Sequence, residues 1–177
     1  MNDAPQRIAI LGIGSPHGDD QFGWVVADSL SRRFGSPTRG NALRICLAQP
    51  AGEVRIFKCT NPVDVIPMLD DFDRIVVVDA SVGLPTETQF RRLNYADAID
   101  REWIASRSVR GTHDFGLHQT LQLAQTLGKL IDHVEIWLGH AVAFDPISKM
   151  TQQSAAAIRP CVDAIAEEWC HARTIAG

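Results

Sequence analysis

Short apolar segments alternate along the chain with segments in which apolar residues recur every three or four positions. The first kind includes residues 7–14, RIAILGIG, and 74–81, RIVVVDAS, which are typical of strands buried on both faces of a sheet. The second kind includes residues 20–34 and 115–130, whose apolar side chains would gather on one side of a helix. This alternation predicts an α/β fold with a mostly parallel, twisted sheet.

Further segments have the length and composition of strands. Residues 42–48 and 53–59 are short strand candidates, and residues 133–140 are another apolar strand. Residues 88–94 alternate weakly after a Gly-Leu-Pro turn, so we expect them to pair antiparallel at an edge of the sheet. The predicted fold class is therefore a three-layer α/β/α sandwich of the phosphorylase/hydrolase-like kind, with a mostly parallel sheet and an antiparallel edge strand.

Two more helices complete the expected order of elements. Asn61 is placed to cap a short helix that begins at Pro62. A last helix is predicted near the C-terminus, where Pro160 marks either its first turn or a kink. Its apolar residues recur at helical spacing: Ile158, Val162, Ile165 and Trp169. A chain of 177 residues suffices for one domain with a full core, so we expect a single domain over 1–177.

Composition and charge exclude several classes of protein. Hydrophobic residues make up 45% of the chain and the net charge is -4, so the chain should fold, and it offers no basic face to nucleic acid or an anionic membrane. No apolar run approaches the ~20 residues that span a membrane, and no signal peptide is recognisable, so we expect a cytoplasmic protein. The four cysteines form no C-x-x-C pair, which disfavours a structural zinc site and a disulfide framework.

The most unusual segment is LGIGSPHGDDQFGW, residues 11–24. A glycine-rich turn between a strand and a helix is typical of loops that aim backbone N–H groups at a phosphate. This turn instead ends in two acidic residues, Asp19 and Asp20, and Gly18 comes one residue late for a dinucleotide fingerprint. No acidic residue ends the second strand to hold a ribose, so the pattern favours another use of the turn.

Polar side chains also follow the strongest strands. Asp20 follows the first strand, Asp79 closes the apolar run of 74–81, and His140 ends the strand at 133–140. His113 precedes a predicted helix in GTHDFGL. Because the carboxyl ends of parallel strands share one edge, two carboxylates and an imidazole there suit a divalent metal, or act as acid and base on a water. The structural alternatives are that Asp20 caps the following helix and that Asp79 accepts hydrogen bonds from backbone amides of its own loop.

Taken in order, these motifs resemble those of the maturation endopeptidases of [NiFe] hydrogenases. The glycine turn and acidic pair of that family are matched by GIGSPHGDDQFGW, its central aspartate by RIVVVDAS and its histidine motif by GTHDFGL. The resemblance continues through VEIWLGH and the last helix, and it covers residues 7–169.

The resemblance implies an enzyme that cuts one peptide bond near the C-terminus of a hydrogenase large-subunit precursor after nickel has been inserted. It places both the metal ligands and the catalytic groups on Asp20, Asp79 and His113. It also implies that nickel arrives with the substrate, that no organic cofactor takes part, and that the protease acts as a monomer. No motif places a serine or cysteine nucleophile, in agreement with attack by a water.

Some positions depart from the family pattern. Ser15 replaces the usual asparagine, and the shortened turn makes Asp19 an alternative to Asp20 as the ligand. His17 and His140 are further candidates for contact with the metal or with the substrate tail. Two competing functions stay open: a protein of the same fold that recognises the nickel site without cutting, and a nucleotide-dependent enzyme that uses the glycine turn.

Overall fold

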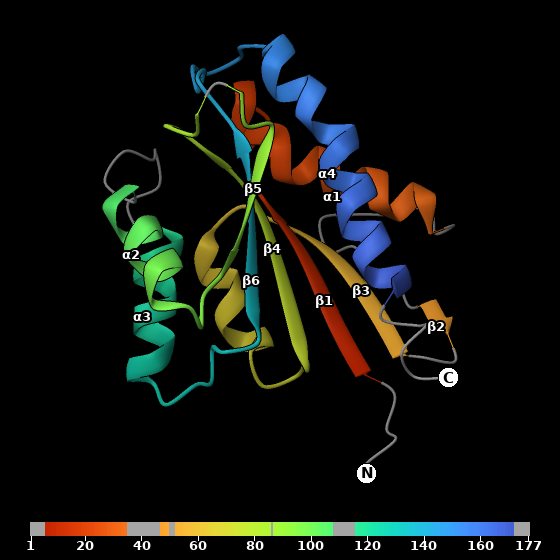
Figure 1. Ribbon diagram of the computed structural model, residues 1–177, viewed down its shortest axis with the longest axis vertical. Helices are drawn as coiled ribbons and strands as arrows, with labels where there is room; N and C mark the ends of the chain where they lie inside the picture. The colour runs from red at the N-terminus through yellow and green to blue at the C-terminus, as the bar shows by residue number, and fades with distance from the viewer. Residues whose placement is uncertain (1–5, 35–46, 50–51, 86, 108–115, 172–177) are drawn as a thin grey trace.

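A twisted sheet forms the middle layer of the molecule (Figure 1). The computed structural model describes residues 6–34, 47–49, 52–85, 87–107 and 116–171. Its strands are β1 (Gln6–Ile13), β2 (Leu47–Gln49), β3 (Gly52–Cys59), β4 (Arg74–Ser81), β5 (Phe90–Asn94) and β6 (Val134–His140). Within the described ranges they form one six-stranded sheet in the order β2-β3-β1-β4-β6-β5. The four central strands are parallel, and the edge strands β2 and β5 pair antiparallel with their neighbours.

Helices cover both faces of this sheet. In the described part of the chain they are α1 (Phe22–Arg33), α2 (Ala98–Arg107), α3 (Leu117–Thr126), α4 (Gln152–His171) and two 3₁₀ helices, η1 (Gly18–Gln21) and η2 (Pro62–Met68). α1 and α4 pack together on one face, whereas α3 and η2 cover the other with α2 beside them (Figure 1). No helix in the described ranges is both long and apolar enough to cross a membrane.

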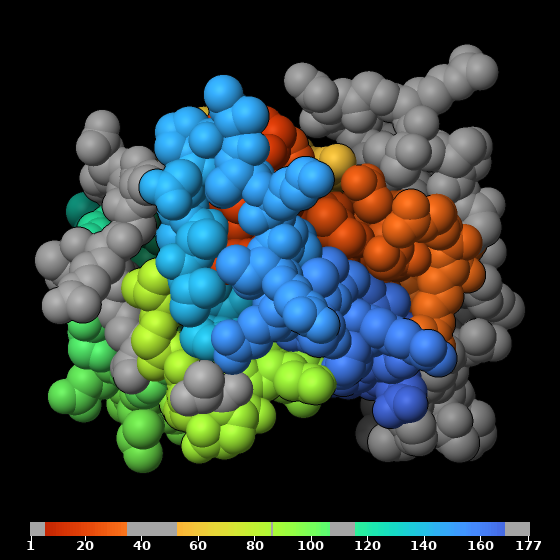
Figure 2. Space-filling view, turned by 90° about the horizontal axis from the view of Figure 1, so that it is seen from above, coloured from red at the N-terminus to blue at the C-terminus, as the bar shows by residue number. Residues whose placement is uncertain are grey.

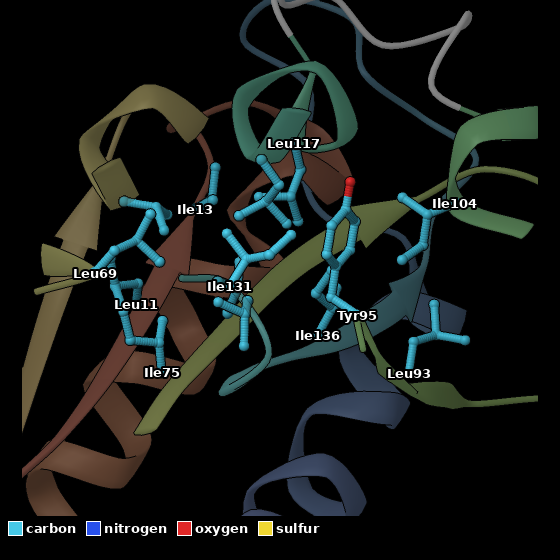
Figure 3. Packing of buried hydrophobic residues seen from close by; sticks show 14 of the residues in the cluster. Leu11, Ile13, Leu69, Ile75, Leu93, Tyr95, Ile104, Leu117, Ile131 and Ile136 are labelled. Carbon is cyan, nitrogen blue, oxygen red and sulfur yellow. The ribbon is translucent and has the colours of Figure 1, made fainter. Parts of the chain in front are cut away.

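Successive residues of the central strands point into two separate apolar cores. On β1, Ile8 and Ile10 pack with α1 and α4, whereas Leu11 and Ile13 pack with α3 and η2 (Figure 3). Burial of each such side chain contributes about 1.5–3 kcal/mol, so both helical layers are held firmly on the sheet. This two-sided burial explains why the central strands appear in the sequence as continuous apolar runs.

The first turn of α1 lies directly on the strand ends. A Cβ at Gly23 would overlap the carbonyl oxygens of Ile13 and Val78, and a Cβ at Gly12 would overlap that of Gly23. Only glycine allows this close approach at both positions. The contact fixes η1 and the start of α1 at the carboxyl ends of β1 and β4, where the candidate acidic residues lie.

The structure confirms the three-layer sandwich and most of the predicted strands. The segments predicted at 7–14, 53–59, 74–81 and 133–140 each agree with an observed strand to within one residue at either end. The antiparallel edge strand predicted at 88–94 is confirmed as β5. The strand predicted at 42–48 is described only from Leu47, where β2 forms a second antiparallel edge, and its earlier residues lie outside the described part.

The structure moves the start of one predicted helix and excludes one of the two alternatives for Pro160. The helix predicted from residue 20 begins at Phe22, because residues 18–21 form a tighter 3₁₀ turn in which the Asp20 N–H donates to the His17 carbonyl at 3.1 Å. Pro160 lies well inside α4, which begins at Gln152, so it does not mark the first turn of that helix. The helix predicted at Pro62 is confirmed as η2, with the Asp64 carboxylate accepting from the Asn61 N–H at 3.4 Å.

The helix α2 is not predicted by the apolar pattern of the sequence. This helix buries Ile104 but leaves Ile99 three-quarters exposed, so its apolar pattern is too sparse to indicate a helix. Trp103 is partly buried, and the guanidinium of Arg91 lies 4.4 Å from the centre of its ring. Packing against β5 and α3 therefore stabilises a helix that periodicity alone does not predict.

Candidate active site

Three of the predicted polar residues lie at the carboxyl edge of the sheet. Asp20 lies in η1, directly after β1, whereas Asp79 is near the end of β4 and His140 ends β6. β4 and β6 are parallel, and their register pairs Asp79 with Leu138 and Ser81 with His140. Paired residues of parallel strands project from the same face, so Asp79 and His140 both point toward the layer of α3 and η2. The topology thus brings these side chains to one end of the molecule.

Asp79 is a carboxyl group with an unusual proton affinity. It is partly exposed, and its Oδ1 accepts a hydrogen bond from the Ala80 N–H at 2.7 Å. Burial among its neighbours raises its pKa to about 8, and the nearby Asp20 carboxylate raises it further against the lowering effect of the Ala80 bond. At neutral pH the metal-free protein therefore keeps a proton on Asp79.

Asp20 is the second carboxylate of the pair and is 6% exposed. The Asp20 carboxylate raises the pKa of Asp79, so a proton or a cation bound there stabilises the pair. A divalent cation would displace the proton from Asp79 and offset the negative charges of both carboxylates. Carboxylate oxygens of this kind accept zinc, nickel or manganese, so the pair suits the metal predicted from the sequence.

The raised pKa of Asp79 predicts how stability depends on pH. A carboxyl whose pKa rises on folding, here from 3.8 to about 8, binds more protons in the folded state, so its contribution to stability decreases as pH rises across that window. The amide introduced by Asp79→Asn would not titrate. We therefore expect the melting temperature of this variant to exceed that of the wild type by a margin that grows from about pH 5 to pH 8. Calorimetry of both metal-free proteins over this range tests it, and a margin independent of pH would contradict the assignment.

His113, the third predicted site residue, lies outside the described residues, so its role stays a prediction. The nearest described helix, α3, begins at Leu117, four positions later in the sequence. Leu117 belongs to the apolar core on the face toward which Asp79 points. The chain thus enters α3 on the same side of the sheet as Asp79.

Neither His17 nor His140 completes a metal site with the two carboxylates. Within the described residues, no three histidine, cysteine or acidic side chains lie close enough together to hold a metal ion. His17 is used elsewhere, since its Nδ1 accepts a hydrogen bond from the Ile147 N–H at 3.2 Å. His140 is 6% exposed, and its Nδ1 makes no hydrogen bond within the described part of the chain.

Asp19, the alternative to Asp20, is fully buried and bonded on both of its oxygens. Its Oδ2 accepts from the N–H groups of Val142 at 2.9 Å and Ala143 at 3.1 Å. Its Oδ1 accepts from the Thr151 N–H at 2.7 Å and from the Thr151 hydroxyl at 2.9 Å. Burial raises its pKa, but these bonds outweigh burial and leave the pKa below its ordinary value. Asp19 is therefore a structural anchor, and Asp20 is the better candidate for chemistry.

The backbone of the glycine turn also argues against a phosphate site. Its N–H groups donate to carbonyl oxygens of the protein, and so they are not directed toward a bound anion. The pairs are Gly14 to Cys59 at 3.1 Å, Ser15 to Asp20 at 3.3 Å, Gly18 to Ser148 at 2.9 Å, Asp19 to Ala143 at 2.7 Å and Asp20 to His17 at 3.1 Å. Because these N–H groups already have protein acceptors, the turn could bind a pyrophosphate only if those hydrogen bonds were broken. Its geometry instead holds Asp20 in place.

The hydrogen-bond partners of Asp19 could not be predicted from the sequence. Val142, Ala143 and Thr151 lie more than 120 residues away from Asp19 in the chain. Two of them bind through main-chain N–H groups alone, which leave no trace in the sequence. Thr151 adds a side-chain bond, but an isolated threonine before a helix is common and signals nothing by itself.

Solved structures of similar fold share this architecture. No protein-family model and no curated protein sequence matches the chain. Hydrogenase maturating endopeptidase HybD from E. coli is 17% identical, with 90% of this chain and 89% of that chain covered and a TM-score of 0.63. The [NiFe] hydrogenase maturation protease HycI from Thermococcus kodakarensis is also 17% identical, with coverage of 93% and 92% and a TM-score of 0.61.

A third similar structure extends the comparison. The hydrogenase 2 maturation peptidase from a Thaumarchaeota archaeon is 22% identical, with 93% of this chain and 98% of that chain covered and a TM-score of 0.55. The coverage shows that the likeness concerns the whole architecture and not one motif. The chain therefore has the fold of hydrogenase maturation endopeptidases, as the motifs predicted.

Proposed function

We propose that this protein is an endopeptidase that removes a C-terminal peptide from the large-subunit precursor of a [NiFe] hydrogenase after nickel insertion. The observation that carries the proposal is the Asp20–Asp79 pair at the carboxyl edge of this fold, in which the pKa of Asp79 is raised. The similar solved structures named as maturation proteases support the same reaction.

In this proposal nickel is part of the substrate, and the protein recognises the precursor by binding this nickel. Asp20, Asp79 and His113 would bind the nickel of the precursor, and the cation would favour the charged, deprotonated form of Asp79 beside Asp20. A precursor without nickel would leave Asp79 protonated at neutral pH, so the charged form that binds the cation would be scarce. This difference provides a physical basis for cutting only after nickel insertion.

The proposed hydrolysis uses water as the nucleophile. A carboxylate of the pair would accept a proton from the attacking water, and a pKa near neutrality suits a group that takes and returns a proton. The two described cysteine thiols do not fit the role of nucleophile, because burial raises the pKa of Cys59 and of Cys161 to about 12. The buried thiols of Cys59 and Cys161 thus support the proposal of direct attack by water.

Intact mass spectrometry of a large-subunit precursor tests the proposal. The precursor encoded with this chain is mixed with the protein, once loaded with nickel and once free of nickel. We expect loss of one defined C-terminal peptide from the loaded precursor alone. Loss from both samples would remove the nickel requirement. A tight complex with no loss in either sample would indicate the competing function, a protein that reads the nickel site without cutting.

A further inference from the structure

The loop between β6 and α4, residues 141–151, presents apolar side chains to solvent beside the candidate site. Ile147 is 90% exposed and Val142 is 60% exposed, although both are large aliphatic residues. The loop lies at the carboxyl edge, and its light-blue atoms cross the middle of the face seen in Figure 2. With one aspartate and one lysine, the loop carries no net charge.

Two sets of hydrogen bonds hold this loop rigidly against the turn that carries Asp20. The Asp19 carboxylate binds both ends of the loop, as described above, and the Asp19 N–H donates back to the Ala143 carbonyl at 2.7 Å. Between these ends, the Gly18 N–H donates to the Ser148 carbonyl at 2.9 Å. A Cβ at Gly18 would overlap the Ala143 carbonyl oxygen, so the turn and the loop interlock.

Ile147 also has a backbone conformation that its side chain disfavours. Its φ is 66°, in the left-handed region that β-branched residues avoid. The His17 Nδ1 accepts the Ile147 N–H at 3.2 Å and helps to hold this conformation. Strained backbone that is held by its surroundings is characteristic of functional sites. Glycine or asparagine would fit this position with less strain, so the conformation of the loop does not require an isoleucine here.

We propose that the β6–α4 loop is the docking surface for the folded hydrogenase precursor, with Ile147 and Val142 inserted into an apolar recess of that protein. This inference rests on the proposed function and adds the place where the substrate is held. A rigid, projecting, uncharged apolar loop fits a concave apolar surface on a folded protein, whereas an extended peptide tail offers no recess. Apolar side chains fixed before binding lose little conformational freedom when they are buried.

The position of the loop explains how docking would serve cleavage. Asp19 binds the loop, and its neighbour Asp20 belongs to the candidate site, so docking and reaction share one rigid unit. A precursor held by Ile147 and Val142 would therefore present its nickel and tail at a fixed distance from Asp20. Docking through this loop does not require nickel, so it can be measured separately from cleavage.

Binding of the nickel-free precursor tests the proposal, by biolayer interferometry with the immobilised wild type, Ile147→Asn and Val142→Ser. We expect each substitution to raise the Kd about 10-fold, the size typical of a residue at the centre of an interface. Ile147→Asn should melt no lower than the wild type, because asparagine tolerates the left-handed region. Leu130→Asn is the matched control, since Leu130 is 74% exposed beyond the far end of α3, and its Kd should not change.

Several outcomes would overturn the docking surface. One is an unchanged Kd for both loop variants, and another is a wild type that does not bind the nickel-free precursor. A third is a wild-type dimer in sedimentation that Ile147→Asn dissociates, which would assign the loop to a second copy of this chain. Cleavage of the nickel-loaded precursor by the wild type is scored separately, so failure of the proposed function is distinguishable from failure of the docking surface.

Discussion

Asp79→Asn is expected to reduce cleavage of the nickel-loaded precursor by roughly 10²–10⁴-fold, the range found when a group that transfers a proton is lost. Asparagine carries no negative charge for the nickel and cannot take a proton from water. Its Oδ1 can still accept the Ala80 N–H bond that Asp79 Oδ1 makes at 2.7 Å, so the strand end should keep its shape. The rate of tail removal, followed by intact mass spectrometry, measures the effect.

A carboxylate at the opposite end of the same strand provides the control for this variant. Asp73 lies just before β4, where its Oδ2 accepts the Arg7 N–H at 2.7 Å. Asp73→Asn makes the same chemical change far from the candidate site and should leave the rate of cleavage as it is. If Asp79→Asn cuts at the wild-type rate, Asp79 has no part in the reaction and the assignment of the site fails.

Asp19→Ala is expected to lower the free energy of unfolding by about 3–5 kcal/mol, as when one partner of a buried charged network is removed. The Asp19 side chain is fully buried, and its loss would leave the Val142, Ala143 and Thr151 N–H groups without their acceptor. Urea denaturation of the variant and the wild type at pH 7 measures the difference.

The pKa of Asp19 gives the same prediction a pH dependence of known sign. A carboxyl whose folded pKa is lowered stabilises the fold above its unfolded pKa, and this contribution is lost as pH falls through the folded pKa. The difference in the free energy of unfolding between Asp19→Ala and the wild type should therefore become smaller at acidic pH. Asp145→Ala is the control, because this exposed residue of the same loop accepts hydrogen bonds through its main-chain carbonyl. A loss below about 1 kcal/mol for Asp19→Ala would show that the anchor is dispensable.

The sequence allowed the sheet to be predicted because its central strands are buried on both faces. Segments such as 74–81 have few polar residues, and an acidic residue that closes such a run is costly unless it has a partner or a ligand. This reasoning identifies Asp79 from the sequence alone. Periodicity failed for α2, because Ile99 faces solvent and only Trp103 and Ile104 indicate its buried side.

The division of roles between Asp19 and Asp20 could not be predicted from the sequence. Both residues occupy the same turn, and both are acidic. The difference arises because the loop after β6 folds back onto the turn and places three N–H groups around Asp19. A contact between segments so distant in the chain depends on the packing of the whole sheet. The role of His113 stays a prediction from its motif.

The way in which Asp19 holds the β6–α4 loop has a consequence for how this fold diversifies. Its carboxylate binds the main-chain N–H groups of three loop residues, and every residue except proline possesses such a group. The side chains at positions 142 and 147 are therefore free to change without loosening the anchor. One acidic side chain can therefore hold loops of many different sequences. Under the proposed docking role, exchange of residues 142–147 between proteins of this architecture should transfer the choice of partner while the rest of the fold stays intact.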